Sequence, residues 1–187
     1  SVVTADPRGE ITLVTKGALE NVLEVCSHVQ SGEKAIPLDK AARSAIEQRY
    51  SDWSGQGFRV LGIASKAVAP RSGAYSHADE CDLTFAGFLL FFDPPKPDVR
   101  KTITDLAGRG LQLKIITGDN QKVARHIAQV VGLPVSGLLT GTAINDMRDE
   151  ALWHAVEETT IFAGVDPNQK ERIILALKKR GHVVGYM

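Results

Sequence analysis

The stretch Leu113-Lys114-Ile115-Ile116-Thr117-Gly118-Asp119-Asn120 decides the fold class of this chain. Residues 113–117 form a short, mostly apolar run, which predicts a buried strand. Gly118 predicts a turn directly after it, and residues 120–131 carry apolar side chains at helical spacing until Gly132 ends the helix. A strand, a tight turn and a helix in this order indicate one unit of an α/β domain.

The same alternation continues through the second half of the chain. Helices are expected at 95–109, 120–131, 148–157 and 168–180, and strands at 113–117, 160–165 and 182–186. The segment 134–145 could be read as a glycine-rich phosphate loop, but it lacks the lysine of a Walker pattern, so we interpret it as a connection. Strands that alternate with helices through short connections pair in parallel, and we therefore expect a doubly wound sheet.

The sequence Asp93-Pro94-Pro95-Lys96-Pro97 separates this half from the first. Proline cannot donate a hydrogen bond to a sheet and fixes its own φ, so three prolines in four positions stop a strand and stiffen the chain. We place a domain boundary here, with one domain at 1–92 and another at 93–187.

The first half has an α+β pattern. Two strands, at Val2–Ala5 and 11–15, flank the turn residues Asp6-Pro7-Arg8-Gly9 and predict a hairpin. Helices are expected at 17–26 and, capped by Asp39, at 40–53, with strands at 60–67 and 83–92. The polar segment 70–82 is expected to be an exposed loop.

The composition excludes several classes of protein. Acidic and basic residues balance at 22 each, so the basic excess of a nucleic-acid binder is missing. Cys26 and Cys81 are the only cysteines, which favours a reducing compartment over a disulfide framework. The longest apolar run, 85–92, is far shorter than the roughly 20 residues of a membrane helix. Both ends have a strand-like sequence, which suggests an excised piece of a longer protein.

An anion site is expected at the carboxyl ends of the parallel strands, where such sheets bind their ligands. Thr117, Gly118 and Asp119 lie there, and they offer a hydroxyl, close backbone approach and a helix N-terminus. The alternative is that Asp119 only caps the helix. Lys170 lies in the first turn of a later helix, where a cation is unfavourable and hints at an anionic partner. Its alternative role is that of a solvated surface lysine.

Two features of the first half suit a nucleotide. Lys16 and Gly17 place a positive charge and a bare backbone where a strand ends, although this could be an ordinary strand exit. Arg59 begins a strand and could bind phosphate through its planar fork, although arginine is also common on surfaces. The five histidines show no spacing typical of zinc ligands, so no metal site is predicted.

Five motifs in this order resemble those of the P-type cation-transporting ATPases. They are Lys16-Gly17-Ala18-Leu19-Glu20, Gly57-Phe58-Arg59-Val60-Leu61, Asp93-Pro94-Pro95-Lys96, Thr117-Gly118-Asp119 and Pro167-Asn168-Gln169-Lys170. Leu19 stands where the family has proline. The amino-acid sequence of residues 25–39 and 78–83 is most similar to that of the bacterial magnesium-transporting subgroup.

The resemblance implies a fold and a set of roles. Residues 1–92 would be the C-terminal part of a nucleotide-binding domain, an antiparallel sheet with helices. Residues 93–187 would be part of a doubly wound, Rossmann-like phosphorylation domain of the haloacid-dehalogenase type. Lys16 and Gly17 would line the adenine pocket, and Arg59 would reach the phosphates of ATP. Thr117, in the loop with Gly118, would hydrogen-bond the phosphoryl group and Lys170 would neutralise it. Asp119 would lie near the nucleotide and Mg²⁺.

In such an enzyme an aspartate attacks the γ-phosphoryl group, and the aspartyl-phosphate is then hydrolysed to drive cation transport. The family's nucleophile segment, its Gly-Asp-Gly-x-Asn-Asp run and its adenine-stacking aromatic residue are absent from this sequence. The chain alone is therefore not expected to hydrolyse ATP. Gly164 also stands where many relatives carry arginine, which puts one nucleotide contact in doubt.

The expected partners are ATP and the transmembrane and actuator domains of the same pump. The chain would be located at the cytoplasmic face of a bacterial inner membrane. Mg²⁺ is the candidate for the transported cation, which would not bind this segment. Two alternatives remain open at this point. One is a soluble phosphatase of the haloacid-dehalogenase type with Asp93 as its nucleophile, and the other is a non-catalytic module that only holds nucleotide.

Overall fold

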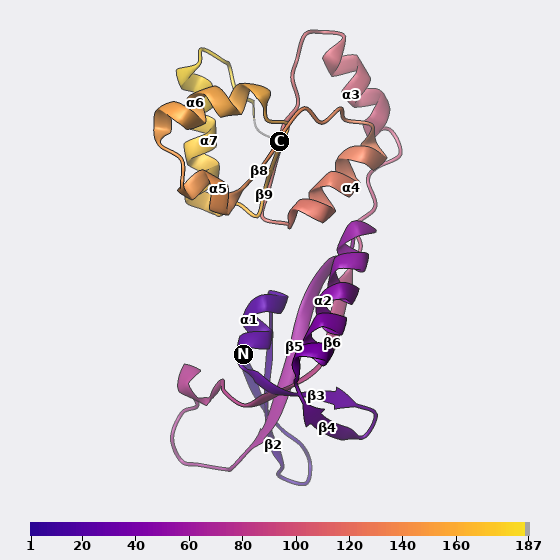
Figure 1. The fold of residues 1–187 in the computed structure, drawn as a ribbon, viewed down its shortest axis with the longest axis vertical. Helices are drawn as coiled ribbons and strands as arrows, with labels where there is room; N and C mark the ends of the chain where they lie inside the picture. The colour runs from indigo at the N-terminus through magenta and orange to yellow at the C-terminus, as the bar shows by residue number, and fades with distance from the viewer. Residues whose placement is uncertain (186–187) are drawn as a thin grey trace. The chain divides into compact units, whose positions relative to one another are not determined.

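The computed structural model describes residues 1–185 and divides the chain into two compact units (Figure 1). The first unit comprises residues 1–53 and 58–92. The second comprises residues 54–57 and the chain from residue 93 onward. The whole is an α/β structure, as the sequence predicts. The second unit has a parallel sheet, whereas the sheet of the first unit is mixed rather than antiparallel as expected, because β3 and β6 pair in parallel.

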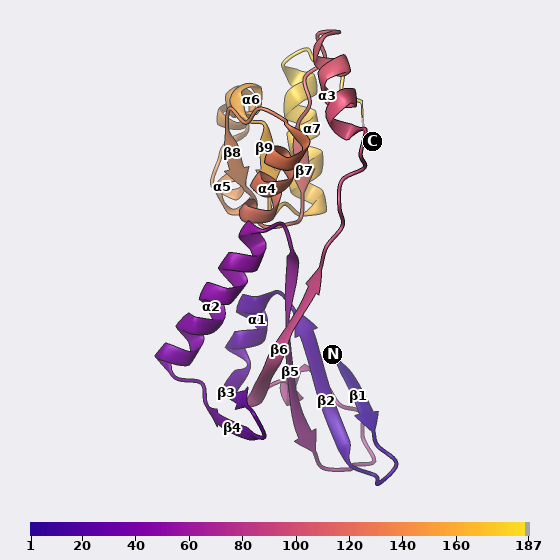
Figure 2. The same cartoon turned by 90° about the vertical axis from the view of Figure 1, so that its right-hand side faces the viewer.

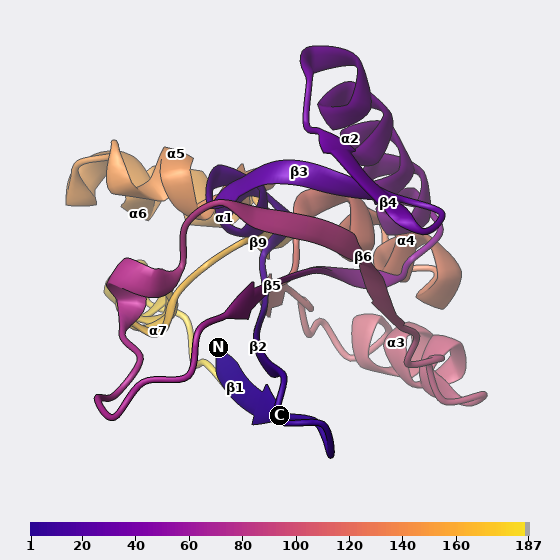
Figure 3. The same ribbon diagram turned by 90° about the horizontal axis from the view of Figure 1, so that it is seen from below.

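The first unit is built on a six-stranded sheet in the order β1-β2-β5-β6-β3-β4, which can be followed in Figure 3. Neighbouring strands are antiparallel, except that β3 and β6 are parallel. The strands are β1 (Val2–Ala5), β2 (Ile11–Gly17), β3 (Cys26–Ser31), β4 (Lys34–Pro37), β5 (Arg59–Val68) and β6 (Leu83–Phe91).

One face of this sheet is covered by α1 (Leu19–Glu24) and α2 (Lys40–Gly55), and Figure 2 shows both helices on the same side. The core between them is apolar and consists of Leu13, Leu19, Val22, Leu23, Ile46, Ala64, Leu83 and Phe85. The cap that the sequence predicts for α2 is present, because the carboxylate of Asp39 accepts a hydrogen bond from the backbone N–H of Ala42 at 2.8 Å.

The predicted hairpin is confirmed, and its turn forms for the expected reason. The Asp6 carboxylate accepts hydrogen bonds from the backbone N–H groups of Arg8 and Glu10 at 2.9 and 2.8 Å. Gly9 takes a φ of +82°, which a residue with a side chain rarely adopts.

One expectation for this unit was wrong, and two strands were not predicted. The predicted helix 17–26 ends at Glu24, because Cys26 already belongs to β3. The sequence analysis also found no strand at 26–37, where β3 and β4 form by pairing with each other and with β6. Long-range pairing decides these strands, and their mostly polar residues give no local signal.

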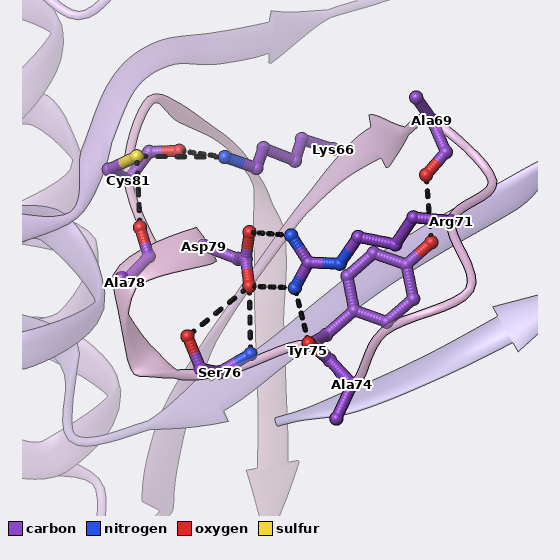
Figure 4. A network of polar contacts seen from close by, with 9 residues as sticks. All are labelled: Lys66, Ala69, Arg71, Ala74, Tyr75, Ser76, Ala78, Asp79 and Cys81. Carbon is purple, nitrogen blue, oxygen red and sulfur yellow. Dashed lines mark hydrogen bonds and ion pairs between the residues drawn. The ribbon is translucent and has the colours of Figure 1, made fainter.

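The loop at 70–82 is exposed, as predicted, but it is tied together by a network of polar contacts that includes the short 3₁₀ helix η1 (His77–Asp79) (Figure 4). The Arg71 guanidinium donates to both carboxylate oxygens of Asp79, at 3.0 and 2.6 Å, and lies 4.3 Å from the centre of the Tyr75 ring. Asp79 also accepts from the backbone N–H of Ser76 at 2.7 Å. The hydrogen bond with Arg71, followed by that with Ser76, holds the pKa of Asp79 below its ordinary value.

Replacement of Asp79 by alanine is expected to loosen this loop without unfolding the unit. Chymotrypsin should then cleave after Tyr75 faster than in the wild type, whereas the thermal midpoint should stay the same because an exposed ion pair adds little stability. The Glu33→Ala variant, which removes an exposed acid from another turn, is the control and should be cleaved like the wild type. Equal cleavage of Asp79→Ala and wild type would show that the network does not order the loop.

The second unit contains a three-stranded parallel sheet in the order β7-β9-β8. Its elements are α3 (Val99–Ala107), β7 (Ile115–Thr117), α4 (Gln121–Val131), β8 (Leu138–Thr140), α5 (Gly141–Asn145), α6 (Asp149–Glu158), β9 (Ile161–Ala163) and α7 (Pro167–Lys179).

Helices cover both faces of this sheet, and successive residues of β9 point to opposite faces. Ile161 and Ala163 pack with α4, and Phe162 packs with α5, α6 and α7. Figure 1 shows α4 on one side of the strands and the other three helices on the opposite side. The burial of all three β9 residues follows from this arrangement and is typical of a central parallel strand.

Three expectations for this unit also need correction. The predicted helix 95–109 begins only at Val99. Pro97 lies in the predicted first turn, and a proline disfavours helical backbone at the residue before it. The segment 134–145, interpreted as a connection, contains β8 and α5. The predicted strand 182–186 does not form over residues 182–185, and Tyr186 lies outside the described residues.

Cys26 and Cys81 are both free thiols. Over residues 1–185 the structure contains no helix that combines the length and the apolarity needed to cross a membrane.

Candidate functional site

The loop between β7 and α4 folds around Thr117 and Asp119. The backbone N–H of Asp119 donates to the hydroxyl oxygen of Thr117 at 3.1 Å, and this hydroxyl donates to the Asp119 carboxylate at 3.1 Å. Thr117 is the last residue of β7, so its side chain lies at the carboxyl end of the strand. This is the end at which open parallel sheets bind ligands.

The helix after this loop is capped by Asn120. The side-chain oxygen of Asn120 accepts hydrogen bonds from the backbone N–H groups of Lys122 and Val123, at 3.0 and 3.1 Å. The alternative that Asp119 is only a helix cap is therefore wrong. Gly118 is exposed, and a side-chain carbon there would lie 3.6 Å from the nearest atom, the carbonyl oxygen of Val165. The fold itself does not require glycine at this position.

Lys170 lies in the first turn of α7. Asp166 caps this helix by accepting a hydrogen bond from the backbone N–H of Gln169 at 2.8 Å, and the Gln169 side chain accepts one from the backbone N–H of Asp166 at 2.9 Å. Pro167 occupies the first helical position, where its missing N–H costs nothing. Lys170 is half-buried, and its backbone N–H donates to the carbonyl oxygen of Asp166 at 2.9 Å.

The structure brings the Thr117 loop and the turn before Lys170 together. Strands β7 and β9 are parallel neighbours, with Thr117 opposite Ala163, so both end at the same edge of the sheet. Beyond the strands, the backbone N–H of Val165 donates to the carbonyl oxygen of Thr117 at 3.1 Å, and that of Gly164 donates to the carbonyl oxygen of Asp119 at 2.7 Å. The two loops thus form one continuous backbone-bonded edge.

Gly164 is in the left-handed region of backbone conformation, with φ at +63°. No atom lies within 4 Å of the position that a side-chain carbon would take, so space does not exclude the arginine that the family resemblance leads one to expect. The backbone does disfavour it, because a residue with a side chain is strained at this φ. The absence of arginine at position 164 therefore agrees with the local conformation.

In the first unit, Lys16 and Arg59 lie on one face of the sheet. Lys16 is opposite Ile63 in the β2–β5 pairing, and Arg59 lies four residues before Ile63 in β5. Because side chains alternate along a strand, Arg59, Leu61 and Ile63 share the face of Lys16. The opposite face carries Val60 and Ala64 and is covered by the helices.

Sequence analysis missed Leu61 and Ile63. Both are only half-buried, as is Leu89, which is paired with Leu61 on the adjacent strand β6. An apolar strip therefore runs between Lys16 and Arg59. The alternation of side chains along the strand that begins at Arg59 could have indicated this strip. Gly17 is paired with Gly62, so it lies at the same end of β2 as Lys16.

The described residues hold no group of three histidine, cysteine, aspartate or glutamate side chains that could bind a metal ion. Two carboxylates lie at the edge formed by the Thr117 loop and the β9–α7 turn: Asp119 in the loop and Asp166, which caps α7. Any divalent cation there would need further oxygen ligands from ATP or from elsewhere.

Comparison with known sequences establishes the protein family of this chain. A family profile described as "P-type ATPase, cytoplasmic domain N" matches residues 1–98. The chain belongs to the P-type ATPase family, and the predicted resemblance is confirmed.

Similar proteins match along nearly the whole chain. The magnesium-transporting ATPase P-type 1 of Escherichia coli K12 is 38% identical over all 187 residues, and that of Salmonella typhimurium LT2 is 37% identical. The calcium-transporting ATPase 1 of Saccharomyces cerevisiae is 34% identical over 92% of this chain. The chain spans 21% of the length of the two bacterial proteins and 19% of the yeast protein.

Proposed function

We propose that this chain is the ATP-binding and phosphoryl-transfer portion of a P-type ATPase, which couples ATP hydrolysis through an aspartyl-phosphate to cation transport. Residues 1–92 would belong to the nucleotide-binding domain, and residues 93–187 to a doubly wound phosphorylation domain of the haloacid-dehalogenase type. The chain would work at the cytoplasmic face of the membrane as part of a larger pump. Mg²⁺ is the candidate transported cation, since the name of the bacterial relatives states it.

One observation carries the proposal. Thr117 and the turn before Lys170 follow two paired parallel strands and are joined by the backbone hydrogen bonds of Gly164 and Val165. A hydroxyl at this edge, with a lysine in the first turn of the helix that follows it, suits a phosphoryl group.

Thr117 and Lys170 would each act on the transferred phosphoryl group. Thr117 would donate a hydrogen bond to a phosphoryl oxygen, which requires its hydroxyl to turn away from Asp119. Lys170 would offset the negative charge of the phosphoryl group and of the attacked carboxylate. ATP supplies the phosphoryl group when bound, and Mg²⁺ offsets charge on its phosphates; Asp119 would lie beside them, with Gly118 leaving room for close approach. The attacking aspartate is not among the residues that we assign in this chain.

The open face of the first unit would hold the nucleotide. Leu61, Ile63 and Leu89 present apolar surface for a purine ring, and Lys16 and Arg59 flank it with positive charge. Arginine suits phosphate because its planar fork can donate two parallel hydrogen bonds. Gly17 would contribute its backbone to this pocket, since a side chain at this position would point toward Val22 on the covered face.

An ATP titration followed by amide chemical shifts tests this proposal on the chain itself. We expect weak binding, shifts near Lys16, Arg59 and Leu61, and negligible turnover. The Arg59→Ala variant should bind more weakly, whereas Arg8→Ala, which removes an exposed arginine of the β1–β2 turn, should bind like the wild type. Shifts confined to the region of Asp93, or phosphatase activity that Asp93→Asn abolishes, would favour the soluble phosphatase and overturn the proposal.

A further inference from the structure

Gln169, the residue before Lys170, is buried at the start of α7 with 7% of its surface exposed. The other buried polar residues in the described part of the chain are serine or threonine, so this is the largest polar side chain in the interior of residues 1–185. Burial of an amide costs free energy unless both its oxygen and its nitrogen find partners. The position of Gln169 therefore depends on the groups around it.

The amide of Gln169 joins three segments of the second unit. Its oxygen accepts from the backbone N–H of Asp166 at 2.9 Å, in the turn between β9 and α7. Its nitrogen donates to the carbonyl oxygen of Gly141 at 3.1 Å, at the start of α5, and to the side-chain oxygen of Asn145 at 2.7 Å, at the end of α5. One side chain thus links the β9–α7 turn to both ends of α5.

The contact between these segments leaves no free space. A side-chain carbon on Gly141 would lie 2.3 Å from the carbonyl oxygen of Gly164 and 2.6 Å from the Gln169 side-chain oxygen. Real side-chain carbons essentially never approach other atoms so closely, so the start of α5 and the β9–α7 turn are in contact only because residue 141 is glycine. Gly164 in turn donates its N–H to the loop that holds Thr117 and Asp119.

We propose that Gln169 is a positioning residue for Lys170, an inference that rests on the proposed function. The β9–α7 turn is held on one side by the Gln169 amide and on the other by the Thr117–Asp119 loop. Since Lys170 follows directly in the same helical turn, this arrangement sets where its ammonium group meets the phosphoryl group. A displacement of about 1 Å at a reacting centre can slow catalysis by roughly 100-fold.

The Gln169→Leu variant tests this in the proposed pump, because leucine has a similar volume and no hydrogen-bonding groups. We expect kcat for ATP hydrolysis to fall by about 10- to 100-fold, with little change in KM, because the residues proposed to hold the nucleotide belong to the other unit. Gln129→Leu removes an exposed glutamine from α4 and serves as the control, for which we expect the wild-type kcat.

A comparison in a second background separates positioning from general structural damage. If Gln169 acts through Lys170, then Gln169→Leu should have almost no further effect on kcat once Lys170 is alanine. Asn145→Ala, which removes one exposed partner and keeps Gln169, should lower kcat in the same direction but less. This variant keeps the inference testable if Gln169→Leu does not fold.

The possible outcomes point to different conclusions. If Lys170→Ala itself left turnover unchanged, the proposed function would be wrong. If Lys170→Ala slowed turnover, but Gln169→Leu and Asn145→Ala did not, the function would stand and the positioning inference would be overturned. An equal loss from Gln169→Leu in both backgrounds would overturn it as well, because it would show an effect independent of Lys170.

Discussion

Replacement of Lys170 by alanine is expected to lower ATP hydrolysis by the proposed pump by about 100- to 1,000-fold. Lys170 is half-buried in the first turn of α7, directly after the β9–α7 turn. We propose that it offsets charge on the transferred phosphoryl group. A charge placed in advance at such a site contributes more than the same charge in water, because it needs no reorganisation during the reaction. Steady-state turnover at saturating ATP measures the effect.

Two variants make this result specific. Lys178→Ala removes an exposed lysine from the last turn of the same helix and should leave turnover near the wild-type value. Lys170→Arg keeps the positive charge in a different shape and should restore part of the rate lost in Lys170→Ala. Equal turnover in Lys170→Ala and Lys178→Ala would mean that Lys170 is the solvated surface lysine of the alternative interpretation.

The Phe162→Ala variant is expected to destabilise the second unit by about 3–5 kcal/mol. Phe162 has no exposed surface and lies at the centre of the core formed with α5, α6 and α7. Because a domain is typically stable by only about 5–15 kcal/mol, this loss would unfold a substantial share of the unit on mild heating.

Urea unfolding, monitored by hydrogen exchange of the β7 and β9 amides, measures this loss of stability for the second unit alone. Leu175→Ala is the matched control, since 56% of that leucine on α7 is exposed and its truncation should cost far less. A cost for Phe162→Ala no greater than that for Leu175→Ala would contradict the two-faced burial of β9.

The parts of the fold that could be predicted are those with a strong local signal. The β1–β2 turn, the Asp39 cap and the strand–turn–helix around Thr117 each follow from a few neighbouring residues. The strands β3, β4 and β8 could not be predicted, because they are short or mostly polar and exist through pairing with distant strands. The same limit applies to the expected strand after α7, whose apolar residues at 182–185 do not pair.

The candidate site divides in the same way. Thr117 and Lys170 could be found because ligands gather where parallel strands end. Thr117 is the last residue of one such strand, and Lys170 comes shortly after another. The sequence suggested Asp119 as the alternative helix cap, but Asn120 takes this role, since both side chain types can cap and the backbone decides. Gln169 gave no signal at all, because a glutamine in a first helical turn is usually exposed and only the close approach of Gly141 buries it.

Orthovanadate, an analogue of a phosphoryl group in transfer, gives the most direct measurement of whether Thr117 and Lys170 bind the same phosphoryl group. Its inhibition constant should be determined for the proposed pump in the wild type, Thr117→Ala, Lys170→Ala and the double variant. We expect each single replacement to weaken inhibition by about tenfold or more, and the double replacement to weaken it by clearly less than the product, because the two groups share one ligand. Independent, fully multiplicative effects, or unchanged inhibition in either single variant, would contradict the account.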